Sequence, residues 1–524
     1  MALSIPAVHV PRFRRSRQLH FKPSLVAPRL PIARLIAVLL ASFGGIVVDQ
    51  TAGGISTTSV NFIQGSFGLT QDEGSWILTA FNAAYFTAIF ISAWATTNFG
   101  RKRTVLAGLL GFAVFSWLCA YAWNVEELIA LRSLQGFALG LVFVPAVTTV
   151  IASVPRSLLG YGFLPFTVTS LSASTVGVFL GGVFVQYAEW QDVFVVMSAF
   201  AVAVAIVVAY VYPTDHGAKR RPFDYVGAIA IFIAFVAFEY VVNEGERRDY
   251  FNDPGIVLAV VTMIVSIAGF ILWKLHLSRH PFFNLRLFKK VSLTLGTLLV
   301  GLLALAQYSG TILAQYSQVA GTEFSPTVAG GIWALRIATF VVGVPLAGLL
   351  IIKLKVNVRI VLTVALAAFA VLTFWQADRM TSTADFGAFA GIALLLGLFQ
   401  GMVNQPIPSL MFGSLTIVEY VFGALIYKMT PQLGGAIALA ISQRLVEVRT
   451  AQNLSDFAGS ATLNRPDIAS FVANANVHVL AAYVNQEASV VAYDDVTRIF
   501  GAVALLMIPV LYLIRLPGAK TAKR

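Results

Sequence analysis

Long apolar segments recur along almost the whole chain and constrain the fold more than any other feature. Of the 524 residues, 58% are hydrophobic and only 11% are charged, whereas soluble globular domains carry about 25% charged residues. Because a bilayer core needs about 20 apolar residues per helix, the pattern predicts an all-α polytopic membrane protein with 14 transmembrane helices. They cover about residues 35–60, 76–98, 104–123, 127–152, 158–187, 192–212, 224–243, 254–275, 291–318, 326–352, 358–377, 384–412, 420–443 and 498–515.

The same composition excludes several other classes of protein. A disordered protein, a coiled coil and a disulfide scaffold do not fit it, and Cys119 is the one cysteine, so no intramolecular disulfide can form. The chain has no Walker-type phosphate loop, and its histidines lie in tails and loops. We therefore expect no enzyme, no metal site and no cofactor. The energy source would be an ion gradient, with protons as the expected ion, or the substrate's own gradient.

The distribution of basic residues predicts the orientation in the membrane. If the N-terminus is cytoplasmic, 26 of the 36 Lys and Arg residues lie inside, 7 lie outside and 3 lie within spans. This asymmetry follows the positive-inside rule and places both termini in the cytoplasm. The net charge is +12, and the basic residues lie between the apolar spans and in a basic tail, residues 1–34. This distribution favours contact of the tail with anionic lipid rather than with nucleic acid.

The longest polar segment separates the last two predicted spans, at residues 444–497. Its apolar residues recur near helical spacing, which predicts short amphipathic helices on the outer face. Two interpretations stay open, namely a capping loop and a docking surface for a partner.

Ionisable residues inside membrane spans are costly and are candidates for function. At 1.5 Å per residue, Asp49 in the first span and Arg132 in the fourth lie at similar depth, each about 8 Å from the outer side of the core. A carboxylate beside a cation can alternate between charged and neutral forms. We predict that Asp49 and Arg132 couple transport to protons; the alternative is a fixed ion pair between helices.

Small residues at four-residue spacing follow Arg132. Gln135, Gly136 and Gly140 lie in the fourth span, and the fifth has a second glycine run at Gly177, Gly181 and Gly182. Glycines at this spacing allow close helix contact. They predict either helices that slide or rock, or packing alone.

Further polar residues within spans predict a substrate cavity. Lys428 could face this cavity or pair with Glu239 or another carboxylate, and cations in the cavity would favour acidic or zwitterionic substrates. The complete predicted cavity set is Asn82, Tyr85, Glu239, Gln307, Tyr308, Gln315, Arg336, Gln400, Asn404 and Lys428.

Several motifs together resemble the fourteen-span drug:proton antiporters of the major facilitator superfamily, closer to the EmrB-like than to the QacA-like branch. The resemblance covers about residues 32–516. The motifs are Val48-Asp49-Gln50-Thr51, Gly100-Arg101-Lys102-Arg103, Arg132-Ser133-Leu134-Gln135-Gly136, the Gly177–Gly182 run, the segment from Arg221 to Gly227, and the long outer loop.

The resemblance implies two six-helix bundles plus two extra central spans and transport by alternating access. Its domains would be a cytoplasmic basic tail (1–34), an N-terminal bundle (35–212), two extra helices with linkers (213–290), a C-terminal bundle (291–515) that includes the 444–497 periplasmic loop, and a cytoplasmic tail (516–524). Asp49 and Arg132 would couple protons, and Gly100, Arg101 and Arg103 would act in gating.

The implied activity is proton-driven export of amphipathic small molecules (drugs, toxic metabolites, or aromatic and organic acids) across a bacterial inner membrane. A periplasmic adaptor and an outer-membrane channel are implied partners. Ala93, Thr97 and Val178 depart from the family's motifs and indicate a divergent member. The alternative function is a facilitator or uptake carrier of the same fold for a specific metabolite.

Overall fold

The computed structural model describes residues 31–154, 167–169, 173, 176–177, 180, 189–214, 222–277, 285–317, 319, 326–412, 415–416, 419–460 and 477–513. These residues form helices and connecting turns, with no β-strand among them. Thirteen helical segments within this part of the chain are long and apolar enough to cross a membrane. The predicted all-α membrane fold is therefore confirmed. The fifth predicted span, 158–187, lies mostly outside the described residues.

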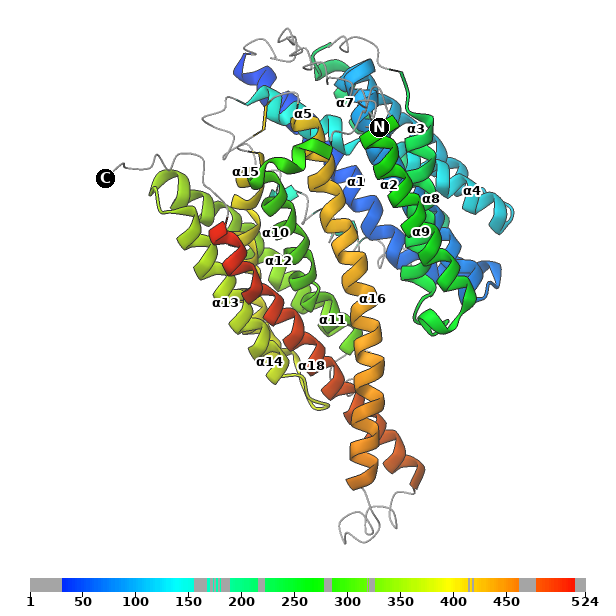
Figure 1. Cartoon of the computed structure of the whole chain (residues 1–524), viewed down its shortest axis with the longest axis vertical. Helices are drawn as coiled ribbons and strands as arrows, with labels where there is room; N and C mark the ends of the chain where they lie inside the picture. Colours follow the sequence, from blue (N-terminus) through cyan, green and yellow to red (C-terminus); the bar gives the residue numbers. More distant parts are fainter. Residues whose placement is uncertain are drawn as a thin grey trace, which may run out of the picture.

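The first helices form one group on the right of Figure 1. α2 packs along α4, α3 packs on α4 and α7, and α1 packs on α5 and α7. The extra pair, α8 and α9, packs against this group through α2. The bounds are α1 Ile32–Phe67, α2 Gln71–Phe99, α3 Arg101–Cys119, α4 Val125–Gly140, α5 Phe143–Ser153, α7 Trp190–Val211, α8 Tyr225–Glu244, η2 Tyr250–Asn252, α9 Pro254–Leu272 and η3 Trp273–Leu277.

The remaining helices form a second group on the left of Figure 1, with α16 running between the two groups. α12 packs along α14, and α18 packs on α10, α13 and α16. The bounds are η4 Leu285–Lys289, α10 Val291–Gln307, α11 Ser309–Tyr316, α12 Pro326–Gly348, η5 Leu349–Lys353, α13 Val358–Asp378, α14 Phe386–Asn404, α15 Pro406–Phe412, α16 Tyr420–Ser460 and α18 Val477–Leu513.

Corresponding spans of the two groups share the same interruption. The span Val125–Ser153 is divided into α4 and α5, and the span Phe386–Phe412 is divided into α14 and α15. Prolines follow both breaks, Pro145 in α5 and Pro406 at the start of α15, and proline disrupts the backbone ladder of a helix. This agreement supports the internal repeat expected of parallel transporter halves.

The largest buried apolar cluster joins the two groups. It includes Tyr85 of α2, Phe143 of α5 and Leu425 of α16. α9 is different, because Leu258, Val261 and Val265 are exposed and few of its residues are buried in the protein. An apolar exposed face suits lipid rather than water, so α9 forms part of the lipid-facing surface.

Two helices are far longer than a membrane crossing requires. α16 has 41 residues and α18 has 37, or about 60 and 55 Å against a hydrocarbon core of about 30 Å. Their lower ends extend beyond the other helices (Figure 1). The predicted 444–497 loop of short helices is wrong in this respect, because helix continues to Ser460 and resumes at Val477. Residues 461–476 lie outside the described part.

Candidate functional site

A buried ion pair connects the two helix groups. The Lys428 ammonium on α16 lies 2.5 Å from the Asp49 carboxylate on α1, and both side chains are buried. Their exposed fractions are 5% for the Lys428 side chain and 0% for that of Asp49. The predicted alternative that Lys428 pairs with a carboxylate is therefore confirmed, with Asp49 rather than Glu239 as its partner.

Neighbouring side chains complete the surroundings of this pair. The Tyr85 hydroxyl on α2 donates to the other Asp49 oxygen at 2.7 Å. Lys428 also donates to the Gln50 side-chain oxygen. Its ammonium lies 4.5 Å from the centre of the Phe143 ring on α5, within the range of a cation–π contact. Four helices therefore meet at one buried charge pair.

Arg132 does not contact Asp49. Its guanidinium donates to Gln135 of the same helix at 2.6 Å and lies 4.2 Å from the centre of the Phe81 ring on α2. Gln135 in turn donates to Ser116 of α3 at 2.5 Å. Among the described residues, no carboxylate forms an ion pair with Arg132. Similar depth thus did not bring the two predicted residues together, since Arg132 points into the N-terminal group.

The glycines of α4 hold it against α2. A Cβ at Gly136 would collide with the Phe81 carbonyl oxygen, and one at Gly140 would collide with that of Tyr85 and lie 2.7 Å from the Ala88 methyl. These contacts agree with the prediction of close helix contact. Gly177 makes the same kind of approach to Thr51 of α1, two residues beyond Asp49. Gly181 and Gly182 lie outside the described residues.

A second buried arginine also binds a glutamine in the other group, but from a neighbouring helix. Arg336 of α12 donates to Gln400 of α14 at 2.8 Å, and Gln400-Gly401 matches Gln135-Gly136 in sequence and in packing. A Cβ at Gly401 would lie 2.8 Å from the Val344 backbone nitrogen on α12. Arg336 forms no ion pair with the described residues, and its Nη2 is buried without a hydrogen-bond partner.

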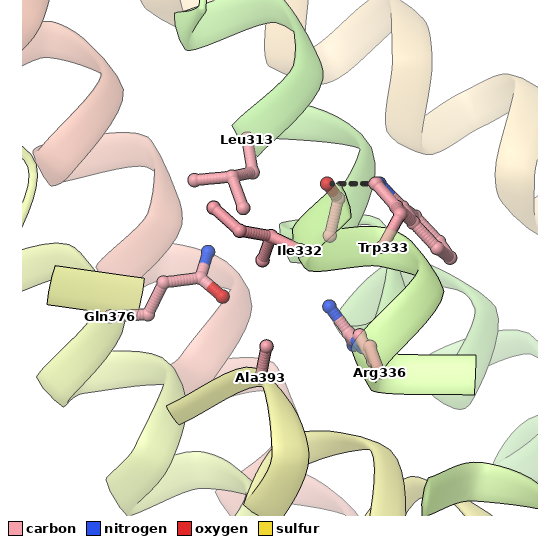
Figure 2. A pocket seen from close by; sticks show the side chains of 7 residues that line it. Leu313, Ile332, Trp333, Arg336, Gln376 and Ala393 are labelled. Carbon is pink, nitrogen blue, oxygen red and sulfur yellow. Dashed lines mark hydrogen bonds between the residues drawn. The ribbon is translucent and has the colours of Figure 1, made fainter. Parts of the chain in front are cut away.

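A small cavity of about 10 Å³ lies beside Arg336, room for about one water molecule. Figure 2 shows Arg336 and Gln376 approaching this space from opposite sides, with Ala393 below it. Trp333 is fixed by its indole N–H, which donates to the Gly310 carbonyl at 3.1 Å. The lining comes only from α11, α12, α13 and α14, so this cavity lies inside the C-terminal group.

Glu239 of α8 is the third ionisable residue of the predicted cavity set, after Lys428 and Arg336, and it is also buried. Its carboxylate accepts from the Asn82 amide on α2 at 3.0 Å and from Asn243 at 3.4 Å. Asn243 also donates to Thr79 of α2 at 3.1 Å. These bonds fasten the extra helix pair to the N-terminal group.

The other predicted cavity residues are dispersed. Asn404 donates to the Gln400 carbonyl of its own helix at 2.9 Å, and the Tyr308 hydroxyl interacts with Gln315. The Gln307 amide nitrogen is buried without a hydrogen-bond partner. The prediction of one cavity lined by all ten residues is not matched by the contacts, which instead gather Asn82, Tyr85, Glu239 and Lys428 near α2.

The predicted gating residues lie at the junction of α2 and α3. Gly100 has φ +89°, which favours glycine because other residues are strained there. Arg101 is buried and Arg103 is exposed. The sequence analysis does not predict four residues that contact the site residues, namely Gln50, Phe143, Asn243 and Gln376. Two of them could have been found from their positions in the sequence, because Gln50 is next to Asp49 and Asn243 is one helical turn after Glu239.

Comparison with known proteins agrees with this architecture. The multidrug export protein EmrB of Escherichia coli is 24% identical over 414 residues, covering 78% of each chain. The fatty acid resistance protein FarB of Neisseria gonorrhoeae is 25% identical over 448 residues, covering 84% of each. The solved proton:xylose symporter XylE has a TM-score of 0.56 at 12% identity, covering 92% of this chain and 95% of its own, which shows the fold alone. Because the profile of the Major Facilitator Superfamily matches residues 41–439, the chain belongs to this superfamily of membrane transporters and is not an enzyme.

Proposed function

We propose that the protein exports amphipathic small molecules in exchange for protons. The names of its relatives, multidrug export and fatty acid resistance, support export of drugs, toxic metabolites or organic acids. The predicted orientation supports a bacterial inner membrane with both termini in the cytoplasm.

The buried Asp49–Lys428 pair is the observation that carries this proposal. Removing two charges from water is costly, and their attraction offsets that cost only while both are charged. A proton on Asp49 cancels the attraction and leaves Lys428 with Gln50 and the ring of Phe143. Since α1 and α16 belong to different helix groups, protonation of Asp49 weakens the contact between the groups.

The Asp49 carboxylate gives the cycle its exchange character. Only the ionised form of Asp49, held beside Lys428, can accept a hydrogen bond or an ion pair from a polar group of a substrate. Uptake of a proton by Asp49 removes that acceptor and releases the substrate, and loss of the proton restores it. Proton and substrate thereby compete for the Asp49 carboxylate, which is the requirement for antiport.

Arg132 has a supporting role in this proposal. It holds Gln135, and through Gln135 it reaches Ser116 of α3, while the adjacent Gly136 packs on α2. α2 presents Tyr85 to Asp49. Arg132 is therefore a positioning residue for the helix that contacts the coupling pair.

The helical extension formed by α16 beyond residue 443 and α18 before residue 498 supports a partner on the outer side. Asn453 of α16 donates to the Ala488 carbonyl of α18 at 3.3 Å, so the two helices brace each other beyond the membrane. We propose that this extension binds a periplasmic adaptor, and that the adaptor connects the exporter to an outer-membrane channel.

The test is transport of a dye or an organic acid into inverted vesicles under an imposed proton gradient. Asp49→Asn cannot exchange a proton, so gradient-driven accumulation should be lost. Asp378→Asn is the matched control, because it also removes a paired carboxylate, but an exposed one bound to Arg498. Gradient-driven transport by the Asp49→Asn variant would contradict the proposal. Transport by wild type at a rate independent of the proton gradient would indicate a facilitator.

A further inference from the structure

Glu239 is a buried acidic residue that forms no ion pair with a cation among the described residues. Its exposed fraction is 3%, and its only polar contacts among the described residues are the amides of Asn82 and Asn243. Glu244, further along the same helix, is equally buried but pairs with Arg247 and lies 3.7 Å from Arg248. The difference between the two glutamates is therefore the absence of a balancing positive charge at Glu239.

The helices around Glu239 explain this absence. α2, α9 and α16 pack against α8, and α2, α8 and α9 contain no Lys or Arg. α2 contributes the carboxylate of Glu73 in its first turn, nine residues along the helix from Asn82. Each cation of α16 has its own acidic partner: Lys428 pairs with Asp49, Arg444 with Asp249 and Glu447, and Arg449 with Asp495.

The hydrogen-bond pattern also favours a neutral acid. Both amide groups donate to the same oxygen, Oε2, as expected for the carbonyl oxygen of a protonated carboxyl group, whose second oxygen bears the hydrogen. An ionised carboxylate buried without a cation is strongly disfavoured, and the group takes up a proton instead.

We propose that Glu239 is a second proton-binding site of the transporter, occupied in this conformation. On release the Oε1–H bond breaks, its electrons remain on Oε1 and the proton passes to water. The carboxylate is then held only by the Asn82 and Asn243 amides. This assigns a chemical role to the extra helix pair.

α2 connects this site to the coupling pair. Asn82, which binds Glu239, and Tyr85, which binds Asp49, are three residues apart on α2 and so lie on neighbouring turns of one face. A movement of α2 that separates Tyr85 from Asp49 therefore also disturbs the Asn82–Glu239 bond. Protonation at the two sites is coupled through one helix.

The protonation state can be read directly by infrared difference spectroscopy of the full-length protein in lipid at pH 7. Wild type minus Glu239→Gln should show loss of a carboxylic acid C=O band that shifts in D₂O. Glu244→Gln, the matched control, should instead lose a carboxylate band. Loss of a carboxylate band in Glu239→Gln would overturn the proposal, because it would show that Glu239 is ionised.

A second experiment measures transport and tests whether this proton takes part in the transport cycle. This part of the inference depends on the proposed antiport function. Gln fixes the neutral form, so gradient-driven transport should fall at least tenfold while substrate–substrate exchange persists. An unchanged gradient-driven rate would contradict a role in coupling. Failure of antiport itself would appear in the Asp49→Asn assay, whereas the infrared result does not depend on transport.

Discussion

Asp49 and Lys428 are 379 positions apart in the sequence, yet their charged groups lie 2.5 Å apart in a site closed to solvent. One residue belongs to the first helix of the N-terminal group and the other to the helix between the groups. The pair is therefore a contact between the two helix groups, which would move relative to each other in the proposed transport cycle.

Breaking this pair from one side should destabilise the protein. Lys428→Met leaves the Asp49 charge buried without its cation, and Asp49→Asn leaves Lys428 in the same position. Removing one partner of a buried pair costs about 3–5 kcal/mol. We expect a lower thermal unfolding temperature in detergent for each single variant.

The double variant Asp49→Asn with Lys428→Met provides the control for that prediction. It leaves no buried unpaired charge, so its unfolding temperature should return close to that of wild type while gradient-driven transport stays absent. If the two single effects simply add in the double variant, the residues are not coupled in stability.

Gly397 of α14 should not tolerate a methyl group. Its Cβ would collide with the Arg336 carbonyl oxygen of α12 and lie 2.7 Å from the carbonyl carbon. Overpacking of this kind costs about 1–3 kcal/mol, so Gly397→Ala should unfold at lower temperature. Gly391 lies on the same helix with nothing within 4 Å of its Cβ position. Gly391→Ala should be neutral or stabilising, since Ala favours helix by about 1 kcal/mol, and equal effects at both sites would refute the packing argument.

The ion pair between Asp224, at the start of α8, and Lys274, just beyond the end of α9, should make the protein sensitive to acid. Burial alone would raise the pKa of Asp224, but hydrogen bonds from Lys274, the Gly227 amide and Trp273 outweigh it and lower that pKa below its ordinary value of 3.8. A carboxyl group with a lowered pKa stabilises the fold above its ordinary pKa, and the contribution disappears as the pH falls through the lowered value. Thermal stability should therefore fall below about pH 4.

Asp224→Asn is the matched variant for this pH dependence. Asn can still cap α8, as Asp224 does through the Gly227 amide at 2.9 Å, but it cannot pair with Lys274. We expect lower stability at neutral pH and a flatter stability profile below about pH 4. An acid-induced loss as steep as that of wild type would assign the effect to another group.

The helical extension of α16 and α18 should serve partner binding rather than transport. Replacing residues 448–494 with a short flexible connection should leave transport in inverted vesicles close to that of wild type. Resistance of intact cells should nevertheless fall at least tenfold if an adaptor binds there. Equal resistance of cells that express either form would exclude this surface as a docking site.

Within the described residues the sequence is sufficient to predict the spans, because hydrophobicity follows directly from residue type. It also identified Asp49 and Lys428 as costly buried charges, but not their pairing. Depth along a helix follows from residue spacing, whereas the direction in which a side chain points depends on how the helix is rotated against its neighbours. Arg132 lies at a depth similar to that of Asp49, but its side chain points away from Asp49. Its guanidinium instead contacts Phe81 and Gln135 within the N-terminal group.

The sequence pattern does not predict how far α16 and α18 extend, for a different reason. Polarity after residue 443 marks where the apolar span stops, but a helix can continue into water when its side chains support each other. Arg444 lies 2.7 Å from Glu447 three residues later, and such pairs stabilise exposed helix. Hydropathy therefore located the membrane boundary and not the end of the helix.

Pro431 lies inside α16, one turn beyond Lys428, and a proline within a helix is a common site of bending. From Pro431 to Ser460 the helix is about 44 Å long at 1.5 Å per residue. A tilt of roughly 10° at the proline would displace the outer tip by about 8 Å. In the proposed cycle α16 would therefore act as a lever arm, because a bend at Pro431 that accompanies the gain or loss of one proton at Asp49 would be enlarged at the far end of the helix.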